Sequence, residues 1–461
     1  MMHANRRALS AVFILVAAVA LCLAGVVSAQ AAPAFEQGRI IRSTPDVLPL
    51  RERPAVANRI LNDRLENLLP GLMQETGIDL WLVLAREYAE DPVYFTLVPQ
   101  PSHAARRTTM LIFDLKADGT VDRLSVNRYP LGEPYTAAWS GGDLDEQWQA
   151  LARVIAEREP ERIGINVSDG WAVADGLTHG LHQRLLGVLD KDLRERVVSA
   201  ENLVIRWLET RTEGELAIYP QVVALARSVI GEAFSNQVIT PGVTDTAAVE
   251  WFIAERFEEL DLPIWFHPHV NRQREGGACT DEDAFCGGSG VILPGDVLHT
   301  DVGICYLGLC TDTQEMGYVL RAGESEVPAG LVEALATGNR WQDLLTDAFR
   351  SGRSGDEIFA AALSASRKAG IRASIYTHPI GMFGHAPGPG MGMWDNQGPV
   401  PVYGARILHP NTAYAIEGNI KQAVPEWDDQ NVAIKLEQTA WFDGERVIYA
   451  AGRQTAWHVV R

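Results

Sequence analysis

The sequence has few cysteines, no excess of basic residues and only one long apolar run. Lys and Arg together number 40 against 59 Asp and Glu, so the formal net charge is −19 at pH 7. Nucleic-acid-binding proteins gather Lys and Arg against the phosphates, and this acidic balance argues against such a partner. With 47% hydrophobic and 21% charged residues, the chain has the composition of a globular protein with a large core.

The one long apolar run lies at the N-terminus. Two arginines precede an apolar stretch over residues 11–27, and small residues follow it. This pattern predicts a signal peptide over residues 1–31, with cleavage after Ala29 or Ala31, and hence a periplasmic or secreted protein. An uncleaved membrane anchor is the alternative. No other segment is long and apolar enough to span a membrane, and loss of the two arginines moves the net charge from −19 to about −21.

Four of the five cysteines lie outside the predicted signal peptide: Cys279, Cys286, Cys305 and Cys310. In an oxidising compartment they can form two local bridges, Cys279–Cys286 and Cys305–Cys310. Four buried free thiols are the alternative. The spacings do not match those of a zinc site.

The sequence also lacks the motifs of two common enzyme classes. The segment around Ser289 does not have the Gly-x-Ser-x-Gly spacing of a serine hydrolase. We find no Gly-x-Gly-x-x-Gly motif placed between a strand and a helix, as a dinucleotide site requires.

Hydrophobic periodicity predicts two domains of different class. Over residues 36–207, helical patterns alternate with short apolar strands, which indicates an α/β domain. Over residues 208–461, a few amphipathic helices accompany several strand-like segments, which indicates an α+β domain with a mostly antiparallel sheet.

The strand-like segments of the second domain carry acidic and imidazole groups where apolar ones are expected. These residues are, in chain order, Asp301, Asp312, His378, His385, Glu417 and Glu437. Buried carboxylates are costly unless cations neutralise them, and Lys435 is the only cation close to them in sequence. Four carboxylates and an imidazole suit a pair of Mn²⁺, Co²⁺, Zn²⁺ or Fe²⁺ ions.

The order of these residues resembles that of the pita-bread, M24-type metallopeptidases, which include methionine aminopeptidase, aminopeptidase P and prolidase. "HPIGMFGH", residues 378–385, also fits the family's His-x-x-Gly-x-x-x-His pattern. The likeness covers roughly residues 205–455. The preceding domain resembles the creatinase-type N-terminal domain of aminopeptidase P and prolidase.

The resemblance implies a role for each residue. Asp301 would chelate one of two divalent metal ions, most plausibly Mn²⁺, while Asp312 and Glu437 would bridge the pair. His378 and Glu417 would complete the second site. Glu417 would also accept a proton from the attacking water, and His385 would stabilise the tetrahedral intermediate.

The sequence departs from the family in the residues around this set. Members usually have another His upstream of the first metal-binding Asp, but residues 277–288 contain none. His267 or His269 is a candidate replacement. His299 is expected to point to the opposite face of the sheet and pack there, whereas Lys435 shares a face with Glu437 and is a candidate pairing partner.

These features predict a dinuclear-metal peptidase that hydrolyses the N-terminal bond of peptides or dipeptides, with proline as the preferred second residue. The proline preference comes from the resemblance alone, which also makes a homodimer an expected assembly. One alternative is a creatinase-like hydrolase of another small C–N substrate. The other is a non-catalytic binding protein on the same fold.

Overall fold

The structure is a computed structural model that describes residues 47–277, 279 and 286–461. The predicted signal peptide, residues 1–31, lies outside these ranges. Among the described helices, none has the length and apolarity needed to cross a bilayer.

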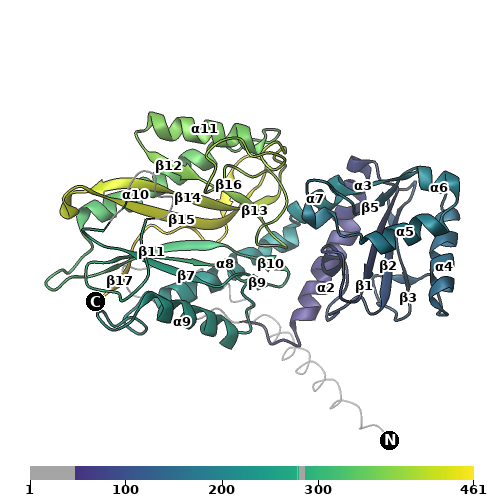
Figure 1. Cartoon of the computed structure of the whole chain (residues 1–461), viewed down its shortest axis with the longest axis horizontal. Coiled ribbons are helices and arrows are strands. Elements are labelled where there is room, and N and C mark those ends of the chain that lie inside the picture. The colour runs from purple at the N-terminus through teal and green to yellow at the C-terminus, as the bar shows by residue number, and fades with distance from the viewer. Residues whose placement is uncertain (1–46, 278, 280–285) are drawn as a thin grey trace, which may run out of the picture. The chain divides into compact units, whose positions relative to one another are not determined.

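The first part of the described chain is built on a six-stranded sheet with the order β4-β3-β2-β1-β5-β6 (Figure 1). β1 pairs antiparallel with β2 and parallel with β5, so the sheet is mixed. The strands are β1 (Leu80–Arg86), β2 (Thr108–Leu115), β3 (Val121–Asn127), β4 (Thr136–Ala137), β5 (Ile163–Ile165) and β6 (Val197–Ser199). The helices are α2 (Arg53–Asp63), the π-helical turn η1 (Arg64–Leu68), α3 (Leu69–Thr76), α4 (Leu144–Ala156), α5 (His179–Val188), α6 (Lys191–Glu195) and α7 (Glu201–Glu209).

Helices cover both faces of this sheet because β1 is apolar on both. Leu80, Leu82 and Leu84 belong to one core cluster, together with buried residues of α4 and α5. The alternate residues Trp81 and Val83 belong to a second cluster, with residues of α2, α3 and α7. The predicted α/β class of this domain is therefore confirmed.

The second part of the described chain contains a nine-stranded sheet with the central order β12-β14-β15-β11-β8-β7. Its strand pairs are antiparallel except for β11 with β17. The strands are β7 (His269–Gln273), β8 (Val297–Val302), β11 (Thr313–Val319), β12 (Arg372–Ile375), β13 (His378–Ile380), β14 (Thr412–Val424), β15 (Gln430–Phe442), β16 (Val447–Tyr449) and β17 (His458–Val460). The helices are α8 (Glu213–Ala233), α9 (Thr246–Glu259), α10 (Ala329–Thr346) and α11 (Gly355–Lys368). These elements confirm the predicted α+β class, whereas the predicted boundary between residues 207 and 208 stays a prediction.

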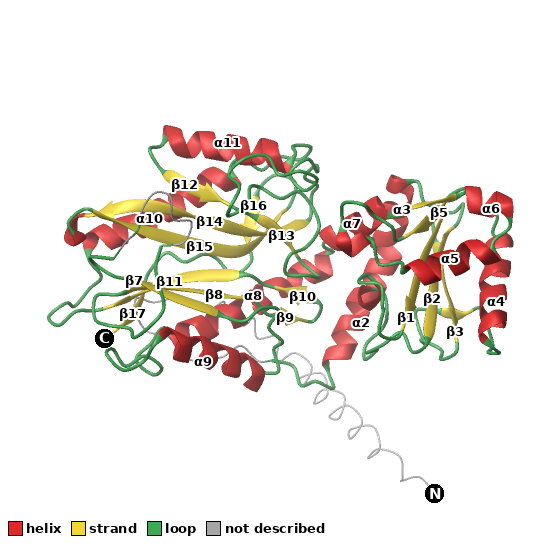
Figure 2. Ribbon diagram, in the orientation of Figure 1, coloured by secondary structure: helices red, strands yellow, loops and turns green. Residues whose placement is uncertain are grey.

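Two pairs of helices cover the two halves of this sheet (Figure 2). α10 and α11 share a core cluster with Ile434 and Leu436 of β15. α8 and α9 share another with Leu298 and Val302 of β8. Side chains alternate along a strand, so the residues between these apolar ones face away from the helices. Asp301 of β8 and Glu437 of β15 occupy such alternate positions.

β8 and β11 are joined by a short hairpin that brings Asp301 and Asp312 together. The hairpin strands are β9 (Cys305–Tyr306) and β10 (Leu309–Cys310), and the turn residues Leu307 and Gly308 both have positive φ angles, 55° and 82°. Two-residue turns of this kind match the twist of a β-hairpin. Leu307 and Gly308 therefore form the turn of this hairpin.

Candidate metal centre

Strand pairing aligns a row of polar side chains across five neighbouring strands. His269 of β7 lies opposite Asp301 of β8, and Asp301 lies opposite Gln314 of β11. Gln314 in turn lies opposite Glu437 of β15, which lies opposite Glu417 of β14. Residues opposite one another in a sheet point to the same face, so one lateral row gathers three of the four predicted carboxylate ligands.

Asp312, which directly precedes β11, and His378, the first residue of β13, complete the cluster. His378 Nε2 lies 3.5 Å from Asp312 Oδ2, 3.5 Å from Glu437 Oε1 and 3.8 Å from Glu417 Oε2. His378 Nδ1 lies 2.9 Å from the carbonyl oxygen of Pro379. A bond from Nδ1–H to that carbonyl would leave Nε2 as the ligand atom and fix the orientation of the ring.

Three overlapping groups in the cluster have ligand atoms that lie within 4.8 Å of one another. The groups are Asp301–Asp312–Glu437, His378–Glu417–Glu437 and Asp312–His378–His385. The structure therefore brings together all six site residues predicted from the sequence.

Burial and mutual repulsion dominate the electrostatics of the cluster. Burial raises the pKa of the Asp301, Asp312 and Glu417 carboxyls well above their usual range, and the charge on Glu437 raises each of them further. Burial alone would lower the pKa of His378, but the Glu437 and Glu417 carboxylates raise it to about 9. The site therefore attracts positive charge.

Three carboxylate oxygens in the cluster are buried without a hydrogen-bond partner: Asp301 Oδ1, Asp312 Oδ1 and Glu437 Oε1. Such oxygens are unstable in an interior unless a cation or a proton satisfies them. These three oxygens, one from each member of the Asp301–Asp312–Glu437 group, can together ligate a divalent cation. Carboxylate oxygens combined with the imidazole of His378 suit Mn²⁺, Co²⁺, Zn²⁺ or Fe²⁺. The residues present thus fit a metal site.

Lys435 lies two residues before Glu437 on β15, as expected for a residue on the same face. Its ammonium group donates to the carbonyl oxygen of Cys286 at 3.0 Å. Burial lowers the pKa of Lys435 to about 8, although attraction to Asp301 opposes the shift. Lys435 therefore interacts electrostatically with the cluster while its hydrogen bond is directed to the Cys286 backbone.

The expectation for His299 was wrong. His299 and Asp301 are two residues apart on β8, and residues two apart point to the same face of a sheet. His299 Nε2 lies 2.8 Å from Gln314 Oε1, so this buried imidazole adjoins the carboxylate cluster. Burial lowers the pKa of His299 well below its usual value, which keeps it neutral.

His385 lies at the outer side of the cluster. Its ring is 4.7 Å from that of His378 and 5.0 Å from that of Trp265, edge to face in both cases. Partial burial and the neighbouring His378 lower the pKa of His385 to about 4, so its imidazole is neutral at pH 7. A neutral imidazole can donate one hydrogen bond to a ligand.

Trp265 is a residue of the site that the sequence did not indicate. Its indole Nε1 donates to the carbonyl oxygen of Thr311 at 2.8 Å, next to Asp312. A Cβ atom on Gly303 or Gly384 would lie 2.1 Å or 2.3 Å from the indole. Trp265 therefore fills the space between the segments that carry Asp301, Asp312 and His385.

The two histidines considered as replacements for the missing upstream His have different surroundings. His267 packs against Trp251, with the ring centroids 4.8 Å apart. His269 lies opposite Asp301 in the row. Burial lowers the pKa of His269, and the charge on Lys435 lowers it further. His269 is therefore the nearer of the two to the cluster.

Both of the predicted disulfide bridges are present, Cys279–Cys286 and Cys305–Cys310. The second joins residues that lie opposite one another in the β9–β10 hairpin. It therefore closes the turn between Asp301 and Asp312.

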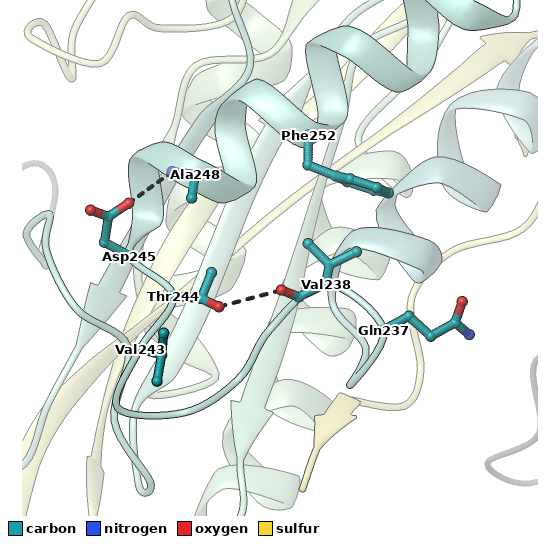
Figure 3. A pocket seen from close by; sticks show the side chains of 7 residues that line it. All are labelled: Gln237, Val238, Val243, Thr244, Asp245, Ala248 and Phe252. Atoms are coloured by element: carbon teal, nitrogen blue, oxygen red, sulfur yellow. Dashed lines mark hydrogen bonds between the residues drawn. The ribbon is translucent and has the colours of Figure 1, made fainter.

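A surface depression of about 510 Å³ lies elsewhere, at the start of α9 (Figure 3). Its lining includes Val243, Phe252 and Asp245, whose carboxylate accepts a hydrogen bond from Ala248 N and caps the helix. None of its lining residues belongs to the carboxylate cluster.

Several solved structures with the same fold are peptidases. X-Pro aminopeptidase from Thermotoga maritima matches with a TM-score of 0.60 at 16% identity, covering 85% of this chain and all of that one. Xaa-Pro dipeptidase from Bacillus anthracis matches at 0.56 and 16%, covering 88% and 100%. A His350Ala variant of Escherichia coli aminopeptidase P matches at 0.56 and 15%, covering 87% and 95%. At this identity the likeness establishes the pita-bread fold.

Sequence comparison locates the family in the second domain. Residues 218–442 match the model of metallopeptidase family M24. A search of curated protein sequences finds no significant match. The matched region contains all the residues of the carboxylate cluster. Residues 218–442 therefore form a domain of metallopeptidase family M24, and the protein is a metal-dependent hydrolase.

Proposed function

We propose that the protein is a dinuclear-metal peptidase that releases the N-terminal residue from peptides or splits dipeptides, with proline at the second position. The observation that carries the two-metal proposal is the set of three buried carboxylate oxygens without hydrogen-bond partners, beside a second group centred on His378. The proline preference is supported by the names of similar structures, which are X-Pro aminopeptidases, Xaa-Pro dipeptidases and prolidases. Peptide is the expected substrate.

The residues divide into two overlapping ligand sets. Asp301, Asp312 and Glu437 would hold one divalent ion, and His378 and Glu417, with Glu437 and Asp312 shared, would hold the other. Mn²⁺ is the first candidate, because the donors are mainly carboxylates, and Co²⁺, Zn²⁺ or Fe²⁺ are alternatives. When bound, such a pair supplies a water activated for attack on a peptide carbonyl.

The protein's own residues would manage the protons and the developing charge. Burial and repulsion from Glu437 raise the pKa of Glu417, so Glu417 is a stronger base than an exposed glutamate and suited to accept a proton. His385 is neutral and outside the main ligand sets, so its N–H can bond the carbonyl oxygen of the scissile peptide as negative charge develops there.

We further propose that the protein is exported to the periplasm or secreted. The charge and hydropathy pattern of residues 1–31 supports this location, and so do the two disulfides, which persist in oxidising compartments. A homodimer is the proposed assembly, by analogy with the pita-bread peptidases.

The activity can be tested with a panel of Xaa-Pro and Xaa-Ala dipeptides and tripeptides. The metal-free protein would be supplied separately with Mn²⁺, Co²⁺ or Zn²⁺, and release of the first residue would be measured. We expect metal-dependent cleavage of Xaa-Pro substrates, with Xaa-Ala cleaved more slowly. Asp301→Asn serves as the inactive control. Bound metal without cleavage of any peptide in the panel would contradict the proposed activity.

A further inference from the structure

Gln314 lies at the centre of the carboxylate cluster. Its side chain is buried, with 3% exposure. Its Nε2 atom lies 2.5 Å from Glu417 Oε1, 2.9 Å from Glu437 Oε2 and 3.3 Å from Asp301 Oδ2. One neutral amide therefore contacts three of the four carboxylates.

The surroundings determine which way the amide points. Carboxylates accept hydrogen bonds, so the NH₂ end of Gln314 must face them. The Oε1 end faces His299 Nε2 at 2.8 Å, and an amide oxygen can only accept, so the proton of this bond is on His299. His299 thereby favours the same orientation of the amide that the carboxylates require.

Glu417 and Glu437 each direct one carboxylate oxygen to Gln314 and the other to His378. Glu417 Oε1 and Glu437 Oε2 accept hydrogen bonds from Gln314. The other two oxygens, Glu417 Oε2 and Glu437 Oε1, lie 3.8 and 3.5 Å from His378 Nε2. Gln314 thus holds both carboxylates in the orientation that directs one oxygen of each to His378.

We propose that Gln314, oriented by His299, is a positioning residue that prepares Glu417 and Glu437 for the metal ion held with His378. The proposal rests on the two-metal function stated above. The shortest contact of Gln314 is to Glu417, which belongs only to the His378 set, whereas Glu437 is shared by both sets. Loss of Gln314 should therefore weaken the ion at His378 more than the ion at Asp301 and Asp312. Partners of this kind typically contribute about 10- to 100-fold to metal affinity.

Metal binding to Gln314→Met tests the proposal without relying on catalysis. Methionine keeps the unbranched shape of glutamine but cannot donate or accept these hydrogen bonds in the same way. Titration calorimetry with Mn²⁺ should show two binding steps for the wild type. In the variant, the step that is lost in His378→Ala should weaken by about 10- to 100-fold, and the other step should change less.

Gln273→Met is the matched control. Gln273 is also a buried glutamine of the same sheet, but its amide bonds the backbone of Ala433, at 2.8 Å in both directions. Its replacement should lower stability without changing either Mn²⁺ affinity. The Co²⁺ absorption spectrum, which reports ligand geometry, should change in Gln314→Met and stay as in the wild type in Gln273→Met.

Three outcomes would overturn the role of Gln314. These are unchanged Mn²⁺ affinities in a folded Gln314→Met variant, equal weakening of both steps, and equal weakening in the Gln273→Met control. Should Gln314→Met fail to fold, Gln314→Asn, which withdraws the amide by one methylene, must show the same selective loss. A wild-type protein that binds fewer than two ions would instead contradict the proposed function.

Discussion

Replacement of Glu437 by glutamine should stabilise the metal-free protein while it removes the stabilisation that metal provides. Glu437 is 1% exposed, and its charge raises the pKa of Asp301, Asp312 and Glu417. Without metal, these like charges repel one another in a buried site. A glutamine removes one of the charges, and its side-chain oxygen can still accept the hydrogen bond from Gln314.

The size of the effect follows from the geometry of the cluster. The ligand atoms in each group lie within 4.8 Å of one another. Two unit charges about 4 Å apart at an effective dielectric constant of about 20 interact by roughly 4 kcal/mol. Because buried neighbours take up protons instead of bearing the full repulsion, we expect a gain of about 1–3 kcal/mol. For a domain of about 150–250 residues, each kcal/mol raises Tm by roughly 2–4 °C.

Calorimetric melting with chelator and with Mn²⁺ measures both effects. Mn²⁺ at about 1,000 times the Kd of each site should stabilise the wild type by roughly 4 kcal/mol for each bound ion, whereas the Tm of Glu437→Gln should change little on addition of Mn²⁺. Glu315→Gln is the control. Glu315 is equally buried but paired with Arg227 at 2.6 Å, so its replacement should lower Tm with or without metal. A lower Tm of metal-free Glu437→Gln, with the Mn²⁺ shift retained, would refute this reasoning.

Three further predictions concern other residues. His269→Ala should reduce kcat, because His269 lies opposite Asp301, while His267→Ala should leave turnover near the wild-type rate; equal rates for the two variants would contradict this assignment. Burial raises the pKa of Asp91 to about 6, so its contribution to stability is complete below pH about 4 and is lost as the pH rises through about 6. Urea unfolding should therefore show stability declining over this range, with a shallower decline in Asp91→Asn. Gly384→Ala should lower kcat with unchanged metal content, because its Cβ would lie 2.3 Å from Trp265 beside His385; unaltered kcat would show that Trp265 does not position His385.

The candidate metal-binding residues could be predicted because each is chemically out of place. Asp301, Glu417 and Glu437 interrupt apolar strand patterns, where an unpaired carboxylate would be costly. Their order along the chain, together with His378, then indicated the family. The two domain classes were predictable for a similar reason, because helical and strand periodicities are strong local signals.

The residues that support the ligands left no comparable local signal. Gln314 is uncharged, and its contact with Glu437 depends on the pairing of strands 123 residues apart. Trp265 reaches the site from a loop through a close approach to Gly303 and Gly384. His299 was placed on the wrong face, although the alternation of side chains along β8 already puts it on the side of Asp301.

The disulfide bridges could be predicted only in part. Their spacing allowed local bridges but also free thiols, because proximity in sequence does not fix the distance between side chains. The β9–β10 register places Cys305 opposite Cys310 and thereby favours that bridge.

We propose that the carboxylate cluster holds two divalent metal ions. Crystals grown with Mn²⁺ and measured at the manganese absorption edge test it most directly, because anomalous scattering locates each ion. We expect two peaks per chain, one ligated by Asp301, Asp312 and Glu437 and one by His378, Glu417 and Glu437. No peak at these residues, or a single peak at saturating Mn²⁺, would contradict it.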